Sequence, residues 1–258
     1  MEETGKNPIQ VAERLFQVIE CLAENGPMGI MDLSAQLGFH KSTTHRLVTS
    51  LQYMGYIRQD EESLKYALSL KFLEIGGKIL EQTNMASLVH PSLKKLSEQT
   101  GETVHLVRRE GTEAVYIDKV ESTVSSIRMV SRVGSRIPLY CSGVGKALLA
   151  ELPDPEIEDI WNSSEITSLT PYTVTSLSDL MDRIRGVREA GYAMDDEENE
   201  EGVRCIAVSI PDYHKEPVYA LSISAPVSRM TDARIAELAV DVLAFKKELE
   251  KTLGFSRS

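Results

Sequence analysis

Short polar and basic side chains between residues 41 and 49 have the types and spacing to bind DNA. Placed at 100° steps on a helix, four of them share one face: Ser42, His45, Arg46 and Thr49. Lys41 and Thr43 lie at the edges of this face, near a helix N-terminus whose free N–H groups favour anions. Arginine can donate two hydrogen bonds to guanine, while hydroxyls and imidazoles can bond base edges or phosphates. We therefore predict that this face contacts DNA.

The alternative is an ordinary solvated helix face, and the local charge argues against it. Residues 33–59 contain Lys41, Arg46 and Arg58 but no acidic residue, in a chain with 39 acidic and 28 basic residues. Solubility alone does not produce such a local depletion of acids. The acidic residues are concentrated elsewhere: residues 151–201 carry a net charge of −12, against +1 for the rest of the chain, and are mostly expected to be a solvated surface.

Two helices joined by a tight turn must position this face. The first carries Leu33 and Leu37 inward and ends at Gly38, which tolerates the positive φ of a helix terminus. The second starts near His40, and its opposite side is predicted to pack through Thr44, Leu47, Val48, Leu51 and Met54. This pattern is typical of a helix-turn-helix.

The flanking segments complete a winged helix. An amphipathic helix precedes the pair and ends at Asn25-Gly26-Pro27; its apolar positions are Val11, Leu15, Val18, Ile19 and Leu22. Residues 56–59 and 64–68 then predict a hairpin with its turn at 60–63. Arg58 and Lys65 are its candidates for phosphate contacts.

Downstream, residues 70–82 predict a linker helix that contains Gly76-Gly77, either as a hinge or as a close helix contact in a dimer. Another helix is expected at 84–99, followed by short strand-like runs up to Val120. Further helices are predicted at 143–151, 155–162, 177–190 and 231–253, with strands at 205–210 and 218–225. This mixture indicates an α+β or α/β domain.

Length and composition fit a soluble two-domain protein of the cytoplasm. The chain has 258 residues, 42% of them hydrophobic, and no apolar run near the 18 residues of a membrane span. Its acidic N-terminus is unlike a signal peptide. Cys21, Cys141 and Cys205 are odd in number and widely spaced, so we expect reduced thiols.

Three fragments invite an enzymatic interpretation, but each lacks a needed partner. Residues 143–146 (GVGK) resemble the tail of a phosphate loop, yet Ala147 replaces the metal-binding hydroxyl. Ser142 lacks the glycine of a nucleophile elbow, and Cys205 has no local base. The five histidines show no metal-ligand spacing. We therefore expect no catalytic site, metal or cofactor, and interpret residues 143–146 as a helix start that could hold a carboxylate.

Five sequence blocks, in this order, resemble the IclR family of bacterial transcription regulators: ERLFQVIECLAENG, HKSTTHRLVTSL, SGVGKALLAEL, GYAMDDEENEEGVRCIAVSI and ALSISAPVSRMT. The resemblance implies a winged helix-turn-helix at 1–69, a linker helix at 70–83 and a GAF-like effector domain at 84–258. It also implies a homodimer or a dimer of dimers on a palindromic DNA operator. The wing tip departs from the family pattern, because Asp60-Glu61-Glu62-Ser63 opposes a phosphate backbone.

The resemblance further implies an effector pocket, at positions that match Met129, Gly143, Val144, Asp195, Cys205, Ser222 and Ser224. Amides at Gly143 and Val144 could bind a carboxylate, the two serines could donate hydrogen bonds, and Asp195 could accept them. A small hydroxy or keto acid, such as a sugar-derived monoacid, fits this lining. For each residue, simple core packing remains an alternative.

The expected function is an effector-controlled transcription regulator, with repression and activation both open. The alternative is a small-molecule enzyme that carries a winged-helix appendage, which a complete catalytic constellation would favour.

Overall fold

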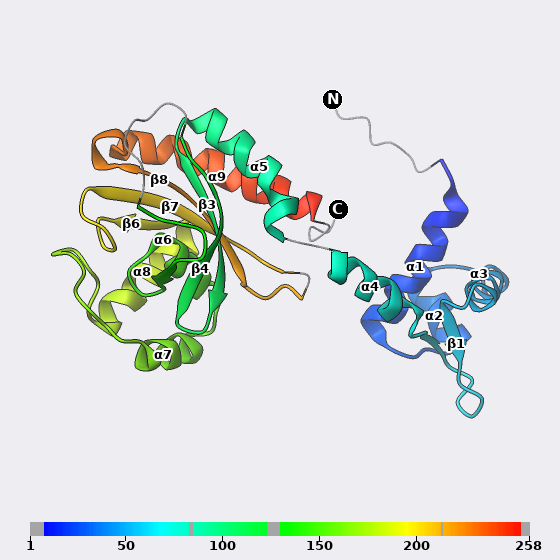
Figure 1. The fold of residues 1–258 in the computed structure, drawn as a ribbon. Helices are drawn as coiled ribbons and strands as arrows, with labels where there is room; N and C mark the ends of the chain where they lie inside the picture. Colours follow the sequence, from blue (N-terminus) through cyan, green and yellow to red (C-terminus); the bar gives the residue numbers. More distant parts are fainter. Residues whose placement is uncertain (1–7, 83–84, 123–129, 213, 254–258) are drawn as a thin grey trace. The chain divides into compact units, whose positions relative to one another are not determined.

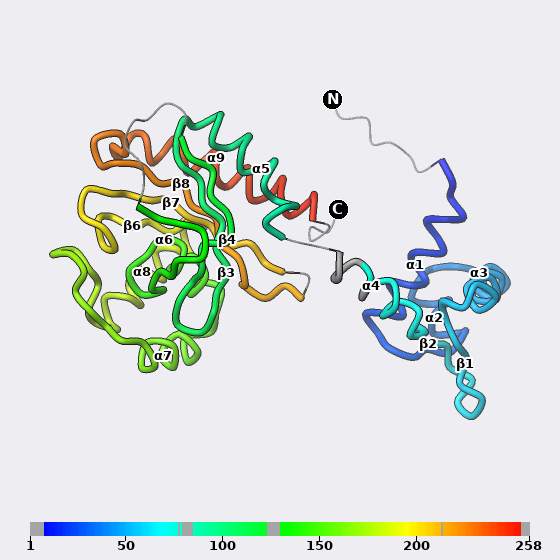
Figure 2. The backbone as a smooth tube through the Cα atoms, viewed as in Figure 1, coloured from blue at the N-terminus to red at the C-terminus, as the bar shows by residue number. Residues whose placement is uncertain are grey.

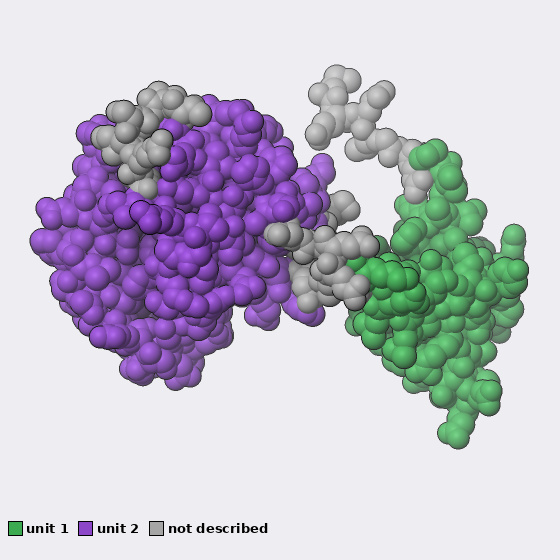
Figure 3. Space-filling view, in the orientation of Figure 1, with its two compact units in different colours: residues 1–83 green, residues 84–258 purple. Residues whose placement is uncertain are grey.

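The computed structural model describes residues 8–82, 85–122, 130–212 and 214–253. The chain forms two compact units, residues 1–83 and 84–258, which are coloured separately in Figure 3. Each unit has its own buried apolar residues, in one cluster in the first unit and two in the second.

The first unit is a helix-turn-helix with a two-stranded wing (Figure 1). Its elements are α1 (Gln10–Asn25), α2 (Ile30–Leu37), α3 (Lys41–Tyr53), β1 (Ile57–Gln59), β2 (Tyr66–Leu68) and α4 (Lys71–Gln82). The three N-terminal helices and the wing enclose a small core that includes Val18, Leu33 and Val48. The predicted winged helix-turn-helix is thus present.

The helix pair follows the predicted pattern with one exception. Gly38 ends α2 at a φ of 67°, as its place after Leu37 predicted. Thr44 of α3 is buried together with three apolar neighbours, Leu47, Val48 and Leu51. Met54 was expected in the same core but is 38% exposed. It lies outside the packed side because α3 ends at Tyr53 and Met54 is its C-cap.

The wing has a longer turn than predicted. Strand β2 begins only at Tyr66, so Lys65 belongs to the turn and not to the strand. The Asp60 carboxylate shapes this turn, because it accepts hydrogen bonds from the Ser63 amide at 2.8 Å and the Ser63 hydroxyl at 2.7 Å. Leu64 then takes a φ of 54°, a conformation that interrupts the strand.

The predicted linker segment forms α4 as one continuous helix that includes both glycines. A Cβ added to Gly76 would meet no atom of the described residues within 4 Å, so none of them packs closely enough there to require a glycine. The hinge and the dimer-contact interpretations both remain predictions.

The second unit is an α+β domain built on a six-stranded antiparallel sheet (Figures 1 and 2). The strands are β3 (Thr103–Glu110), β4 (Glu113–Val120), β5 (Arg136–Pro138), β6 (Ala193–Asp196), β7 (Val203–Ile210) and β8 (Tyr219–Pro226). Their order across the sheet is β5-β4-β3-β8-β7-β6. The α+β prediction is therefore confirmed, while the likeness to GAF domains stays a prediction. Strands β5 and β6 are short and were not predicted.

Helices cover both faces of this sheet. They are α5 (Met85–Thr100), α6 (Gly143–Ala150), α7 (Asp154–Ser163), α8 (Leu177–Ala190) and α9 (Asp232–Thr252), with a 3₁₀ turn at Val227–Arg229. α5 and α9 pack on one face around apolar residues such as Leu106, Leu221 and Ile223. α6 packs on the other face and against α8.

α6 packs closely against Leu139 and Asp195 because two of its residues are glycines. A Cβ at Gly145 would overlap the backbone of Leu139, and a Cβ at Gly143 would lie 3.4 Å from the Asp195 amide nitrogen. Ser142 caps the helix by accepting a hydrogen bond from the Gly145 amide at 3.1 Å. The GVGK segment thus starts a helix that packs closely against the sheet. This agrees with the predicted helix start and not with a phosphate loop.

Candidate DNA-binding face and effector cup

The predicted DNA-contacting residues lie on the outer surface of the first unit. Of the six predicted residues in α3, Thr43 is half-buried and the other five are exposed: Lys41, Ser42, His45, Arg46 and Thr49. Arg58 and Lys65 of the wing are also exposed. Thr49 and His45 lie one helical turn apart, with 3.5 Å between the Thr49 hydroxyl oxygen and His45 Nδ1. Within the first unit, these side chains are therefore exposed as contact with DNA would require.

Arg46 also borders a groove of about 280 Å³ between α1 and α3, together with Thr43 and Ser50. Arg14 of α1 lines the same groove and lies over the Phe39 ring, 5.5 Å from its centroid. Arg14 was not predicted, because a single arginine on an amphipathic helix carries no sequence signal of its own. Its position adds a second guanidinium to the groove that Arg46 lines, next to the face predicted to contact DNA.

Four of the predicted effector residues meet on the sheet face opposite α5 and α9. Strand register pairs Cys205 with both Ser224 and Asp195, and it pairs Ser222 with His105. Each of these side chains except Cys205 is at most 4% exposed. We call the group formed by His105, Asp195, Cys205, Ser222 and Ser224 the cup.

His105 lies at the centre of the cup, although sequence analysis did not single it out. Its Nδ1 lies 3.4 Å from the Ser222 hydroxyl and 3.3 Å from the Ser224 hydroxyl, and its Nε2 is 2.7 Å from the Ser131 hydroxyl. Burial, aided by the nearby charge of Lys119, lowers the pKa of His105 to about 3. The imidazole is therefore neutral at physiological pH.

Asp195 lies at the wall of the cup beside the N-terminus of α6. Its Oδ1 accepts hydrogen bonds from the Glu198 amide at 2.8 Å and the Asn199 amide at 3.3 Å. Burial nevertheless raises the pKa of Asp195 to about 7, helped by the charge of Glu198 and opposed by Lys146. Near neutral pH, this carboxyl is therefore divided between its protonated and ionised forms.

The thiols near the cup stay protonated. Burial raises the pKa of Cys141 to about 12 and raises the pKa of Cys205 well above its usual range, with Asp195 adding to both shifts. Neither has the lowered pKa that a nucleophile needs. Cys205 therefore fits the predicted structural thiol.

Behind Asp195 lies an ion pair that sequence analysis also missed. Lys146 of α6 contacts the Glu198 carboxylate, and the two side chains are 2% and 3% exposed. In the sequence, this lysine stood out only as part of the rejected phosphate loop, and nothing marked Glu198 among its acidic neighbours. Of the remaining predicted effector residues, Gly143 and Val144 are buried at the start of α6, whereas Met129 lies outside the described residues.

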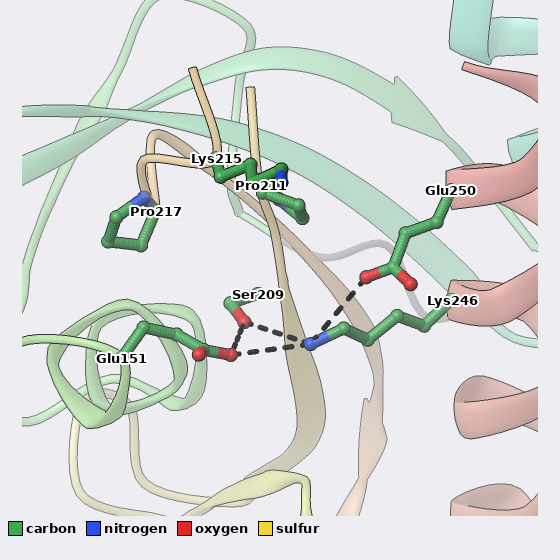
Figure 4. Close-up of a pocket in the computed structure, with 7 residues that line it drawn as sticks. All are labelled: Glu151, Ser209, Pro211, Lys215, Pro217, Lys246 and Glu250. Carbon is green, nitrogen blue, oxygen red and sulfur yellow. Dashed lines mark hydrogen bonds and ion pairs between the residues drawn. The ribbon is translucent and has the colours of Figure 1, made fainter. Parts of the chain in front are cut away.

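A separate cavity of about 250 Å³, lined by both polar side chains and prolines, lies where α9 meets the end of β7 (Figure 4). The Lys246 ammonium points to the Ser209 hydroxyl at 3.2 Å and the Glu151 carboxylate at 3.3 Å, with Glu250 at 4.0 Å. Because these groups satisfy one another, the cluster ties α9 to α6 and β7. These contacts form a network between the helices and the sheet.

Two kinds of feature are absent from the described part of the chain. No group of three histidine, cysteine or acidic side chains there is placed to hold a metal ion. Within the same residues, no helix has the length and apolar character needed to cross a membrane.

Comparisons with known proteins decide the class. The family model of the IclR helix-turn-helix domain matches residues 11–61, and that of the bacterial transcriptional regulator IclR C-terminal domain matches residues 77–250. The chain belongs to the IclR family. It is therefore a DNA-binding transcription regulator and not an enzyme with a winged-helix appendage.

Relatives cover almost the whole chain. The Acetate operon repressor of Salmonella typhimurium is 37% identical over 252 residues, which are 96% of this chain and 92% of the relative. HTH-type transcriptional regulator KdgR of Escherichia coli is 34% identical over 255 residues, 98% of this chain and 97% of the relative. The crystal structure of Thermotoga maritima IclR matches with a TM-score of 0.64 at 31% identity, covering 95% of this chain and 99% of that one.

The raised pKa of Asp195 predicts how stability changes with pH. In the unfolded chain, Asp195 has its ordinary pKa of 3.8 and is ionised above about pH 4. In the folded protein, it keeps its proton up to about pH 7. This carboxyl therefore favours the folded state at low pH, and its contribution is lost as pH rises from 4 to 7. As pH rises from 5 to 8, the free energy of unfolding of wild type should fall by roughly 2–3 kcal/mol relative to that of Asp195→Asn.

Urea unfolding of both proteins at several pH values measures this difference. His105, whose lowered pKa has the opposite effect below pH 6.5, is present in both proteins and cancels. A difference between the two that is flat from pH 5 to 8 would show that Asp195 titrates normally.

Proposed function

We propose that this IclR-family regulator represses transcription by binding a palindromic operator as a homodimer or dimer of dimers. The main support for this proposal is that the predicted DNA-contacting face of α3 is exposed and contains no acidic residue. Repression is supported by the names of the similar proteins, which include the Acetate operon repressor and Transcriptional repressor IclR of Escherichia coli. A two-fold dimer would present two α3 helices to half-sites about 34 Å apart or a multiple of that.

Within each half-site, we assign α3 to the major groove and the wing strands to the backbone. Arg46 and its neighbours Ser42, His45 and Thr49 face the base edges, while Lys41, Thr43, Arg58 and Lys65 supply phosphate contacts. The wing tip contributes little, because Glu61 and Glu62 are exposed there and repel phosphates.

We further propose that a small hydroxy or keto monoacid controls this binding from the cup. Buried polar groups are normally well paired, yet the two serine hydroxyls share one ring nitrogen of His105 at 3.3–3.4 Å. They are therefore suited to donate to a ligand. A carboxylate at the Gly143 and Val144 amides, at the α6 N-terminus, fits the helix dipole. In its ionised form, Asp195 can accept a hydrogen bond from a ligand hydroxyl and disfavours a second carboxylate.

The assignment of α3 predicts distinct effects for its two kinds of contact. Arg46→Ala should reduce discrimination between operator and random DNA by roughly 1–3 kcal/mol, because a base contact is lost. Lys41→Ala should weaken binding to both DNAs alike. Fluorescence anisotropy at physiological salt, with the DNA upstream of the gene for this protein as operator, measures both effects.

His214 in the second unit supplies the control, since His214→Ala should leave both affinities unchanged. Full operator affinity in Arg46→Ala would contradict the groove assignment.

If the effector binds in the cup, removing the serine hydroxyls there should abolish the response to the effector without reducing DNA binding. The double variant Ser222→Ala/Ser224→Ala should bind the operator as wild type does when no acid is present. The effector acid should change the free energy of operator binding by wild type by about 1–3 kcal/mol. The same acid should leave operator binding by the double variant unchanged. A gel-shift titration with a panel of hydroxy and keto acids measures the response.

Ser209→Ala is a matched control, because Ser209 is a buried sheet serine that contacts Lys246 and lies outside the cup. An unchanged response in the double variant would place the effector elsewhere. Lost DNA binding without any acid would mean that the two serines serve only the fold.

A further inference from the structure

A groove of about 380 Å³ runs along α8 and the edge strand β6. Gly186 of α8 and Met194 of β6 line it, and its innermost groups are Lys146 and Glu198. Strand register places Met194 and Asp195 next to each other on opposite faces of the sheet, so this groove is not the cup. We call it the α8 groove.

Glu198 gives the α8 groove an unmet hydrogen-bonding group. The side chain is 3% exposed, and Lys146 contacts only its Oε1. Glu198 Oε2 is buried and has no hydrogen-bond partner among the described residues. A buried acceptor of this kind is costly, so a ligand that donates a hydrogen bond to it would be bound favourably.

The donor that fits Glu198 is a hydroxyl and not an ammonium group. Lys146 already neutralises this carboxylate, so a second cation at Oε2 would lie close to the lysine ammonium in a site of low dielectric constant. A hydroxyl donates the same hydrogen bond without that repulsion. The inner end of the α8 groove is therefore selective for an alcohol.

The outer part of the α8 groove favours a negative charge. Asp196 is paired with Arg204, with 2.7 Å between Oδ1 and Nε, and Asp182 is paired with Arg185. Arg183 also lines the groove, is exposed, and forms no ion pair within the described part of the chain. Its guanidinium is suited to a carboxylate.

We propose that the α8 groove is a second small-molecule site, distinct from the cup, that binds a hydroxy acid. A ligand hydroxyl donates to Glu198 Oε2, and the ligand carboxylate lies at Arg183. Because the Glu198 amide also donates to Asp195 Oδ1 at 2.8 Å, residues 195–198 connect this site to the cup. A ligand here is thus placed to modify the response to one bound there.

Full-length protein with ¹³C-methyl methionine and D-gluconate as the probe tests this site. The Met194 signal, assigned with Met194→Leu, should shift saturably with gluconate. Hexanoate, which lacks the hydroxyls, and sorbitol, which lacks the carboxylate, should shift it at least tenfold more weakly at equal concentration. Arg183→Ala should raise the apparent Kd for gluconate at least tenfold.

Gly186 allows the α8 groove to be blocked without disturbing Glu198. A Cβ at this position meets nothing within 4 Å, so both Gly186→Ala and Gly186→Phe should fold. The phenylalanine should abolish the Met194 shift and the alanine should keep it. No shift in wild type, or an undiminished shift in Gly186→Phe, would overturn the proposal.

The cup is tested separately in the same experiment. The Ser222→Ala/Ser224→Ala protein should retain the gluconate shift of Met194, even if the effector is found not to bind the cup. Loss of the Met194 shift in that protein would place gluconate in the cup and would also overturn a separate site.

Discussion

The buried ion pair between Lys146 and Glu198 is the interaction on which the second unit depends. It joins α6 to the loop that follows β6, and both side chains are almost fully enclosed. The same loop donates the amide hydrogen bonds that hold Asp195, while Thr170 and Thr173 donate to the carbonyls of Glu197 and Glu198. The N-terminus of α6, the wall of the cup and the inner end of the α8 groove therefore share one anchor.

A buried ion pair rarely stabilises a fold more than well-packed apolar residues would, so its value here lies in what it positions. It brings an α6 N-terminus, a carboxyl that titrates near pH 7 and a half-paired glutamate into one region. A ligand that binds one of these groups changes the electrostatic environment of the others. The control of DNA binding proposed above requires only that such a ligand prefer one arrangement of the protein.

Sequence analysis predicted what depends on local pattern. The periodicity of α3 and the glycine after Leu37 defined the helix-turn-helix, and the segment GVGK was correctly placed at a helix start. It failed where distant residues meet: 52 positions separate Lys146 from Glu198, and 117 separate His105 from Ser222. His105 lies in a strand whose alternation was recognised, but strand register alone brings it to the serines. Short strands such as β6 have too few residues for a periodic signal.

A double-mutant cycle on Lys146 and Glu198 tests the central role of this pair most directly. The free energy of unfolding would be measured for wild type, Lys146→Met, Glu198→Leu and the combined variant. Each single change should cost about 3–5 kcal/mol, because it leaves one charge buried and unpaired. The combined change should cost at least 2 kcal/mol less than the sum of the two. If the combined variant lost as much free energy of unfolding as the two single variants together, the account would be contradicted. Such additivity would mean that the two side chains do not depend on each other.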